Sequence, residues 1–191
     1  MWLKFYDEEP EAFDLQVLTF DLASTIKETS SYSVGQLWGT RGPNFYLLDT
    51  IRGRYEAPEL RRKIIRAIRD WQPDATYVEA TELGRSIVQE IRSTTDLRPQ
   101  LRAPHGDKTA RLLAHSARFE AEKVWLPREA PWLDAYVQEL LAFPYGRHDD
   151  QVDATSLALK CLTDIMKLRE PLVRRNPIRR QTVNRLPPTR S

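Results

Sequence analysis

The stretch Leu15-Gln16-Val17-Leu18-Thr19-Phe20-Asp21-Leu22-Ala23 decides the expected fold. Its apolar run is typical of a buried β-strand, and Asp21 interrupts that run near its end. A second short run, Ala75-Thr76-Tyr77-Val78, closes with Glu79. A carboxylate at the end of a buried strand is costly unless a positive group meets it there. The two acids therefore predict a cation-binding site at the strand ends.

A third group of acids opens the last predicted helix, in the sequence His148-Asp149-Asp150-Gln151-Val152-Asp153-Ala154. On a helix, Asp149 and Asp153 lie within roughly 40° of each other, and Asp150 lies roughly 60° from Asp153 on the other side. Asp149 and Asp153 are the preferred pair of ligands, and Asp150 is a reserve ligand or a supporting partner. Taken alone, Asp149 and Asp150 are better explained by helix capping and the helix dipole. Only the combination with Asp21 and Glu79 favours a metal site.

Carboxylates from three elements could hold two divalent ions about 4 Å apart, an arrangement that clamps the attacking and leaving oxygens of a phosphodiester. Ligation by oxygen alone favours Mg²⁺ or Mn²⁺ over zinc. From the residues alone, the prediction is therefore a metal-dependent phosphodiesterase that needs no protein nucleophile. A glycosidase could also use paired carboxylates. The oxygen-rich helix cluster and a basic C-terminal segment fit a polyanionic substrate better.

Composition predicts one soluble domain. The 191 residues are 41% hydrophobic and 29% charged, and no apolar run approaches the length of a membrane span. The single cysteine, Cys161, excludes an internal disulfide and a cysteine-based zinc site, and it suits a cytoplasmic location. The net charge of +2 conceals an asymmetry, because residues 166–191 contain eight Lys or Arg and only one acid. A nucleic acid would therefore be held by local basic patches and this tail.

The periodicity of the chain divides it into three parts. Residues 1–13 are expected to be a linker or a frayed end, residues 14–165 one domain, and residues 166–191 a disordered basic tail rich in Pro and Arg. Within the domain, strands are expected at about 14–23, 34–41, 44–51, 75–79, 99–103 and 124–127. Helices are expected at about 57–71, 85–96, 107–119, after Pro131, and at 148–165. This order predicts an α/β fold with a mixed β-sheet flanked by helices.

Between residues 14 and 160, the chain resembles the C-terminal nuclease domain of tailed-phage terminase large subunits, a branch of the RNase H-like (RuvC-like) superfamily. The order and spacing of several short motifs carry the resemblance. They are Thr19-Phe20-Asp21-Leu22-Ala23, Tyr46-Leu47-Leu48-Asp49 with Arg52, Tyr77-Val78-Glu79-Ala80, Asp107-Lys108 with Arg111, Phe119-Glu120, Val124-Trp125-Leu126-Pro127, Phe143-Pro144, and 148–154.

The resemblance implies an RNase H-like mixed sheet and an endonuclease that cuts concatemeric viral DNA at the start and end of genome packaging. It implies that Asp21, Glu79 and the 149–153 cluster bind two Mg²⁺ or Mn²⁺ ions. The expected partners are double-stranded DNA, a packaging ATPase domain, the portal and the small terminase subunit, in the cytoplasm of a host that carries the phage or prophage. The given sequence contains no GxxxxGK[ST] phosphate loop, so ATP-driven translocation is not assigned to it.

Four cationic or titratable residues are candidates for contact with DNA phosphates: Lys27, Lys108, Arg111 and His148. Solvated surface charge explains the first three equally well, and helix capping is the alternative for His148. Three other functions also remain open. A Holliday-junction resolvase or a transposase-like nuclease would share the fold, and a non-catalytic module that docks on DNA or the portal would bind without cutting.

Overall fold

The computed structural model describes residues 3–23, 32–103 and 116–173. Within these ranges, a seven-stranded sheet has the order β1-β7-β4-β3-β2-β5-β6. The strands are β1 (Lys4–Tyr6), β2 (Leu15–Asp21), β3 (Ser33–Arg41), β4 (Asn44–Gly53), β5 (Ala75–Glu79), β6 (Gln100–Arg102) and β7 (Val124–Pro127). The helices are α1 (Ala57–Trp71), α2 (Glu82–Thr94), α4 (Leu133–Ala142) and α5 (Asp150–Val173), and residues 116–120 are also helical.

The sheet is mixed, as the sequence predicted. Strands β2, β3 and β4 form an antiparallel meander, whereas β5 pairs with β2 and β6 pairs with β5 in parallel. On the other side, β7 is parallel to β4, and β1 is parallel to β7. The predicted hairpin between β3 and β4 is confirmed, and Gly42 adopts a φ of 56° in its turn, a conformation that glycine accepts without strain.

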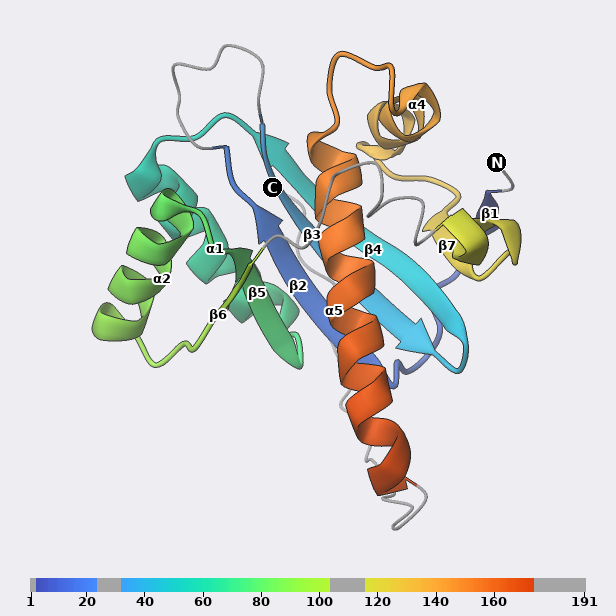
Figure 1. Cartoon of the computed structure of the whole chain (residues 1–191), viewed down its shortest axis with the longest axis horizontal. Helices are drawn as coiled ribbons and strands as arrows, with labels where there is room; N and C mark the ends of the chain where they lie inside the picture. Colours follow the sequence, from blue (N-terminus) through green and yellow to red (C-terminus); the bar gives the residue numbers. More distant parts are fainter. Residues whose placement is uncertain (1–2, 24–31, 104–115, 174–191) are drawn as a thin grey trace.

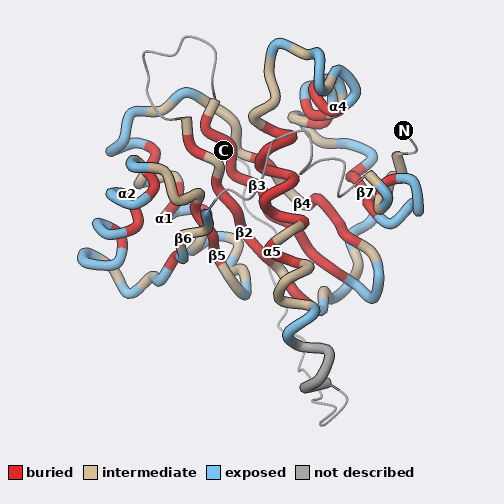
Figure 2. Tube along the Cα trace, in the orientation of Figure 1, coloured by how far each residue is buried: buried red, intermediate tan, exposed pale blue. Residues whose placement is uncertain are grey.

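Each face of the sheet packs against its own helices (Figure 1). Side chains alternate along β2, so that Leu15 and Val17 join the apolar cluster of α4 and α5, while Leu18 and Phe20 join the cluster of α1 and α2. The buried parts of the chain follow the central strands and the side of α5 that faces them (Figure 2). The alternation therefore determines which side chains of β2 face α5, and Asp21 has the same parity as Leu15 and Val17.

Local signals explain where the helices start and end. Helix α1 begins with proline in its first turn and ends at Gln72, which takes a left-handed φ of 46°. Helix α2 begins earlier than predicted, because the Thr81 hydroxyl accepts a hydrogen bond from the Gly84 N–H at 3.1 Å and caps the helix. Helix α5 continues to Val173, eight residues past its predicted end at 165.

Two boundary predictions are wrong. Residues 1–13 were expected to be a linker, but β1 within them extends the sheet beside β7, and the buried Tyr6 hydroxyl donates a hydrogen bond of 2.8 Å to the Leu47 carbonyl. Residues 166–173 were expected to belong to a disordered tail, but they continue α5. Residues 174–191 and most of the predicted helix at 107–119 lie outside the described residues.

The described helices include none with both the length and the apolar character needed to cross a bilayer.

Candidate functional site

The first two site residues, Asp21 and Glu79, end neighbouring parallel strands. Strands β2 and β5 pair in a register that places Phe20 opposite Val78, and the two acids directly follow this pair. Because Tyr77 packs on the α5 side of the sheet, the alternation of β5 directs Glu79 to that side as well. The sequence and the strand register therefore bring the two carboxylates together beside α5.

Asp21 and Glu79 share a hydrogen bond between their side chains. Burial raises the pKa of Asp21 well above its ordinary value, and contact with Glu79 and the nearby charges of Asp153 and Asp150 raise it further. A shared proton is the response of two carboxylates that are close together without a cation between them. The acids thus create a strongly negative position at the ends of β2 and β5.

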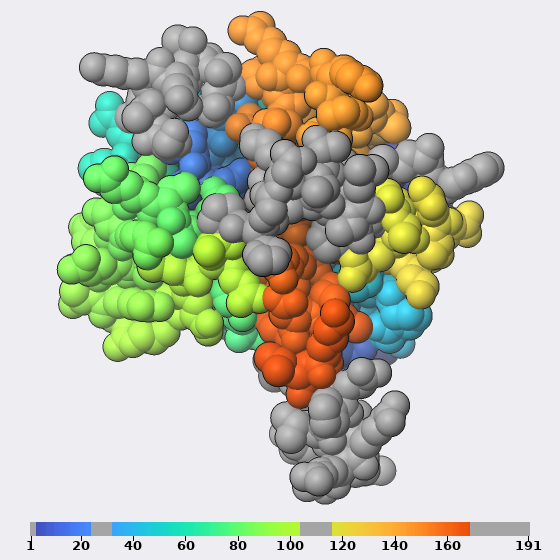
Figure 3. All heavy atoms as spheres, viewed as in Figure 1, coloured from blue at the N-terminus to red at the C-terminus, as the bar shows by residue number. Residues whose placement is uncertain are grey.

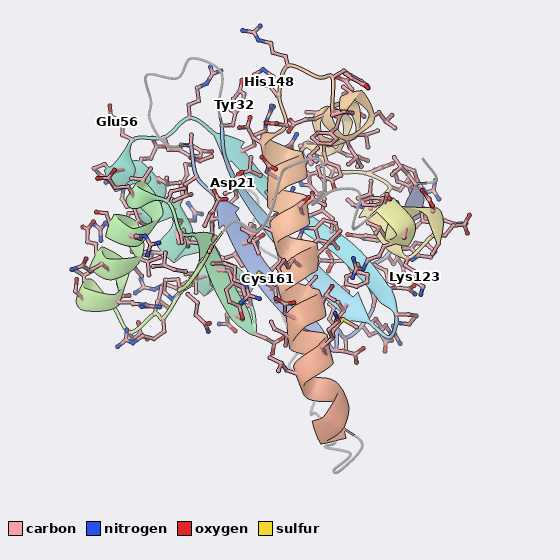
Figure 4. All side chains as sticks on the ribbon, viewed as in Figure 1. Asp21, Tyr32, Glu56, Lys123, His148 and Cys161 are labelled. Carbon is pink, nitrogen blue, oxygen red and sulfur yellow. The ribbon has the colours of Figure 1, made fainter. Side chains whose placement is uncertain are left out.

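The first turn of α5 supplies the other acids. Asp153 is buried at 8% exposure, and its backbone N–H donates to the Asp149 carbonyl at 2.9 Å. Asp150 accepts a hydrogen bond from the backbone N–H of Tyr32, and burial raises the pKa of Asp150 despite this bond. Figure 4 shows Asp21 at the end of β2, beside the upper part of α5.

The structure distinguishes the two neighbouring acids of the helix start. The charges that act on Asp21 are those of Glu79, Asp153 and Asp150, whereas Asp149 acts on the Asp150 carboxyl. The sequence ranked Asp149 ahead of Asp150 as a ligand. The electrostatic surroundings of Asp21 favour the opposite order, which the direct test of each ligand has still to decide.

The site has the chemistry that a hard divalent cation requires. Its donors are carboxylate oxygens, and the raised pKa of Asp21 reflects negative charge that a cation would neutralise. Among the described residues, no three Asp, Glu, His or Cys side chains enclose a common point closely enough to hold a metal ion in their present positions. The carboxylates therefore fit a divalent cation by type and position, and binding would require their side chains to rotate toward it.

An aromatic and basic group borders the acids. The Tyr32 ring has the Arg52 guanidinium 4.0 Å from its centroid and that of Arg54 at 4.4 Å, and His148 meets the same ring edge-on with centroids 5.3 Å apart. His148 Nδ1 also lies 3.9 Å from a carboxylate oxygen of Asp150. Tyr32 and His148 lie close together above Asp21 in Figure 4. Of the four candidates for DNA contact, His148 is thus beside the acids, whereas Lys27, Lys108 and Arg111 lie outside the described residues.

Sequence reasoning missed Glu139. This buried side chain of α4 forms an ion pair with Arg52 at 3.1 Å and accepts hydrogen bonds from Gln151 at the start of α5. Nothing in the local sequence separates Glu139 from a surface acid. A buried position on the predicted helix would have been the only available signal.

One face of the molecule leaves this region visible from outside. In the space-filling view, blue atoms of the β2–β3 part of the chain remain visible between the green α2 region and the orange segment that leads into α5 (Figure 3). The end of β2 is therefore bordered by two separate parts of the chain.

Three solved structures have the same fold. The crystal structure of the large terminase nuclease from thermophilic phage G20c has a TM-score of 0.61 at 17% identity, and the match covers 84% of this chain and 93% of that one. The large terminase from another thermophilic bacteriophage gives 0.64 at 10% identity, over 83% of this chain and 42% of that one. The human cytomegalovirus terminase nuclease domain, Mn soaked and inhibitor bound, gives 0.58 at 12% identity, over 82% and 86%.

The chain thus spans less than half the length of the second of these proteins, the large terminase. No curated protein matches the sequence. A family model described as the terminase RNaseH-like domain matches residues 18–161, which include every described site acid. The RNase H-like fold predicted from the sequence is confirmed, and the chain belongs to the terminase RNaseH-like domain family.

Proposed function

We propose that this chain is a metal-dependent DNA endonuclease of the terminase large-subunit type, which cuts concatemeric viral DNA during genome packaging. The observation that carries the proposal is the shared position of Asp21 and Glu79, at the ends of adjacent parallel strands beside the acids of α5. Carboxylates gathered in this way destabilise a domain unless they bind something positive. Their grouping in a terminase-family fold supports a role in phosphodiester hydrolysis.

Asp21, Glu79, Asp153 and one or both of Asp149 and Asp150 would hold two Mg²⁺ or Mn²⁺ ions. When bound, such ions supply Lewis-acid stabilisation of the charge that develops on a phosphodiester. The Mn-soaked cytomegalovirus nuclease domain, which has the same fold, is consistent with this choice of metal. The roles of the chain's own residues are to exchange a shared proton for a cation and to keep the carboxylates in place.

The basic and aromatic group beside the acids would hold the substrate. His148 borders the site from the α5 side, and Arg54 is an exposed cation on the Tyr32 ring. Cationic side chains of this kind contact the DNA backbone and set its register without reading sequence. Lys27, Lys108 and Arg111 remain proposed contacts. Double-stranded DNA, an ATPase domain, the portal and the small terminase subunit are the proposed partners, in the host cytoplasm.

The test is the incubation of purified protein with supercoiled plasmid in Mg²⁺, Mn²⁺ or EDTA, alongside the Asp21→Asn and Asp70→Asn variants. Asp70 is a matched control because its carboxylate is half exposed and pairs with Arg66 on the surface of α1, away from the site acids. We expect nicking and linearisation with metal in wild type and Asp70→Asn, and none in EDTA or in Asp21→Asn.

Two results would redirect the proposal. Folded protein that binds DNA but leaves plasmid intact with both metals would favour a docking module. Strong preference for cutting a four-way junction over linear duplex of the same sequence would favour a resolvase.

A further inference from the structure

Glu139 on α4 is the most thoroughly buried acid outside the proposed metal-binding set in the described part of the chain. Its Oε1 accepts from the backbone N–H of Gln151 at 2.6 Å, and its Oε2 accepts from the Gln151 side-chain amide at 2.9 Å. The guanidinium of Arg52 completes the set at 3.1 Å. A buried carboxylate with three charged or polar partners is tied to one position.

The bond to Gln151 matters because of its place in the helix. The first amides of a helix have no partner within that helix, and an anionic acceptor there also favours the helix dipole. In α5 this acceptor comes from another helix, so Glu139 fixes the start of α5 relative to α4. The next residue back, Asp150, and the next turn, Asp153, belong to the proposed site.

A second route leads from Glu139 to the same turn. Arg52, held by Glu139, lies 4.0 Å from the Tyr32 ring centroid, and the Tyr32 backbone N–H donates to Asp150. Both arms of Glu139 therefore end at Asp150, one through the α5 backbone and the other through β4 and Tyr32. A single side chain thus connects α4, β4 and α5 at the edge of the acid cluster.

This network is poorly suited to a role in stability alone. Two of its buried atoms, Arg52 Nε and Gln151 Oε1, have no hydrogen-bond partner among the described residues. Buried polar networks that serve only stability are expected to be fully satisfied, since each orphaned atom costs free energy. Farther along the same two helices, the Tyr136 hydroxyl bonds Thr155 at 3.0 Å and already joins α4 to α5.

We propose that Glu139 is a positioning residue of the metal site: it caps α5 from α4 and holds Arg52, and so it fixes where Asp150 and Asp153 face Asp21. The proposal rests on the proposed function for the identity of the site. It predicts that loss of the Glu139 charge loosens the first turn of α5 and weakens the binding of divalent cations without unfolding the domain.

The experiment compares Glu139→Gln with Tyr136→Phe, which breaks a buried bond between the same two helices without touching the first turn of α5. The first readout is amide hydrogen exchange of residues 150–154 in EDTA, which needs neither metal nor activity. We expect exchange in Glu139→Gln to rise about tenfold, because an amide loses a charged acceptor, and to stay near wild type in Tyr136→Phe. Thermal unfolding of both variants shows that each is folded.

The second readout is the Mn²⁺ concentration that gives half-maximal plasmid cutting. We expect it to rise at least about tenfold in Glu139→Gln and to stay unchanged in Tyr136→Phe, as for residues that orient metal ligands. Equal changes in both variants would reduce Glu139 to a stabilising residue and overturn the proposal. So would faster exchange with an unchanged Mn²⁺ requirement. A wild-type protein that neither binds Mn²⁺ nor cuts DNA would instead overturn the proposed function, and the assignment of Glu139 to that site with it.

Discussion

The Asp21→Asn substitution should make the metal-free protein more stable while it abolishes metal-dependent cutting. Asparagine has the shape of aspartate, and its amide can still donate to Glu79, but it carries no negative charge. In the wild type, burial and the charges of Glu79, Asp153 and Asp150 oppose ionisation of Asp21. Removal of the charge therefore relieves an unfavourable interaction that the fold tolerates for another reason.

The size of the gain follows from the electrostatics of the pair. Two charges about 4 Å apart repel by about 4 kcal/mol at an effective dielectric constant of about 20, and a shared proton removes much of this. Each unit of pKa elevation that remains costs the folded protein about 1.4 kcal/mol at neutral pH. We therefore expect Asp21→Asn to gain about 1–3 kcal/mol. For a domain of this size, each kcal/mol raises Tm by about 2–4 °C.

The gain should depend on pH in a defined direction. Because folding raises the pKa of Asp21 above its ordinary value of 3.8, wild-type stability is fully present below that value and is lost as the pH rises through the elevated pKa. The difference between variant and wild type should thus be small at acid pH and largest at neutral pH. Added Mn²⁺ should reverse the order by stabilising only the wild type.

The assay is thermal unfolding in EDTA and in Mn²⁺ from acid to neutral pH, with Asp70→Asn as the control. Asp70 forms a surface ion pair with Arg66, so its substitution should change stability by less than about 0.5 kcal/mol. If Asp21→Asn were no more stable than wild type in EDTA at neutral pH, the acids would not repel one another as described. The electrostatic argument for a cation site would then fail.

Two further substitutions test how the fold supports the site. Gly84→Ala should cost about 1–3 kcal/mol, because its added Cβ would collide with the carbonyl oxygen of Glu79; urea unfolding measures the loss, with the exposed Ser86→Ala as control, and equal stability of the two variants would contradict the close approach. Tyr6→Phe should cost about 1 kcal/mol through the lost hydrogen bond to the Leu47 carbonyl; no change in the urea midpoint would mean that β1 adds nothing to the stability of the domain.

The central strands and their acids were predictable because they depend on local patterns. The apolar run of β2 and the short run of β5 have the composition of buried strands, and an acid marks the end of each. Parallel pairing then places both ends at one edge of the sheet. This reasoning needs no knowledge of the rest of the fold, which explains why Asp21 and Glu79 were found.

Other features depend on contacts between distant residues. Strand β1 has only three residues and no measurable period, and it becomes a strand because β7 offers it an edge. Glu139 looks like any helix acid until Arg52 and Gln151 meet it. The start of α2 was placed late because Gly84 disfavours a helix, although the site needs its small size next to the Glu79 carbonyl. Sequence periodicity carries no information on such contacts.

The order of the site acids along the chain also bears on when the proposed nuclease becomes active. Asp21 and Glu79 can meet once β2 and β5 pair, but their partners in α5 are separated from them by the rest of the domain. Contacts between distant residues form late in folding, because long loops must close first. A partly synthesised or partly folded chain would therefore contain the strand acids without the helix acids. Such a chain could not cleave the nucleic acids around it, and cutting would begin only with the completed domain.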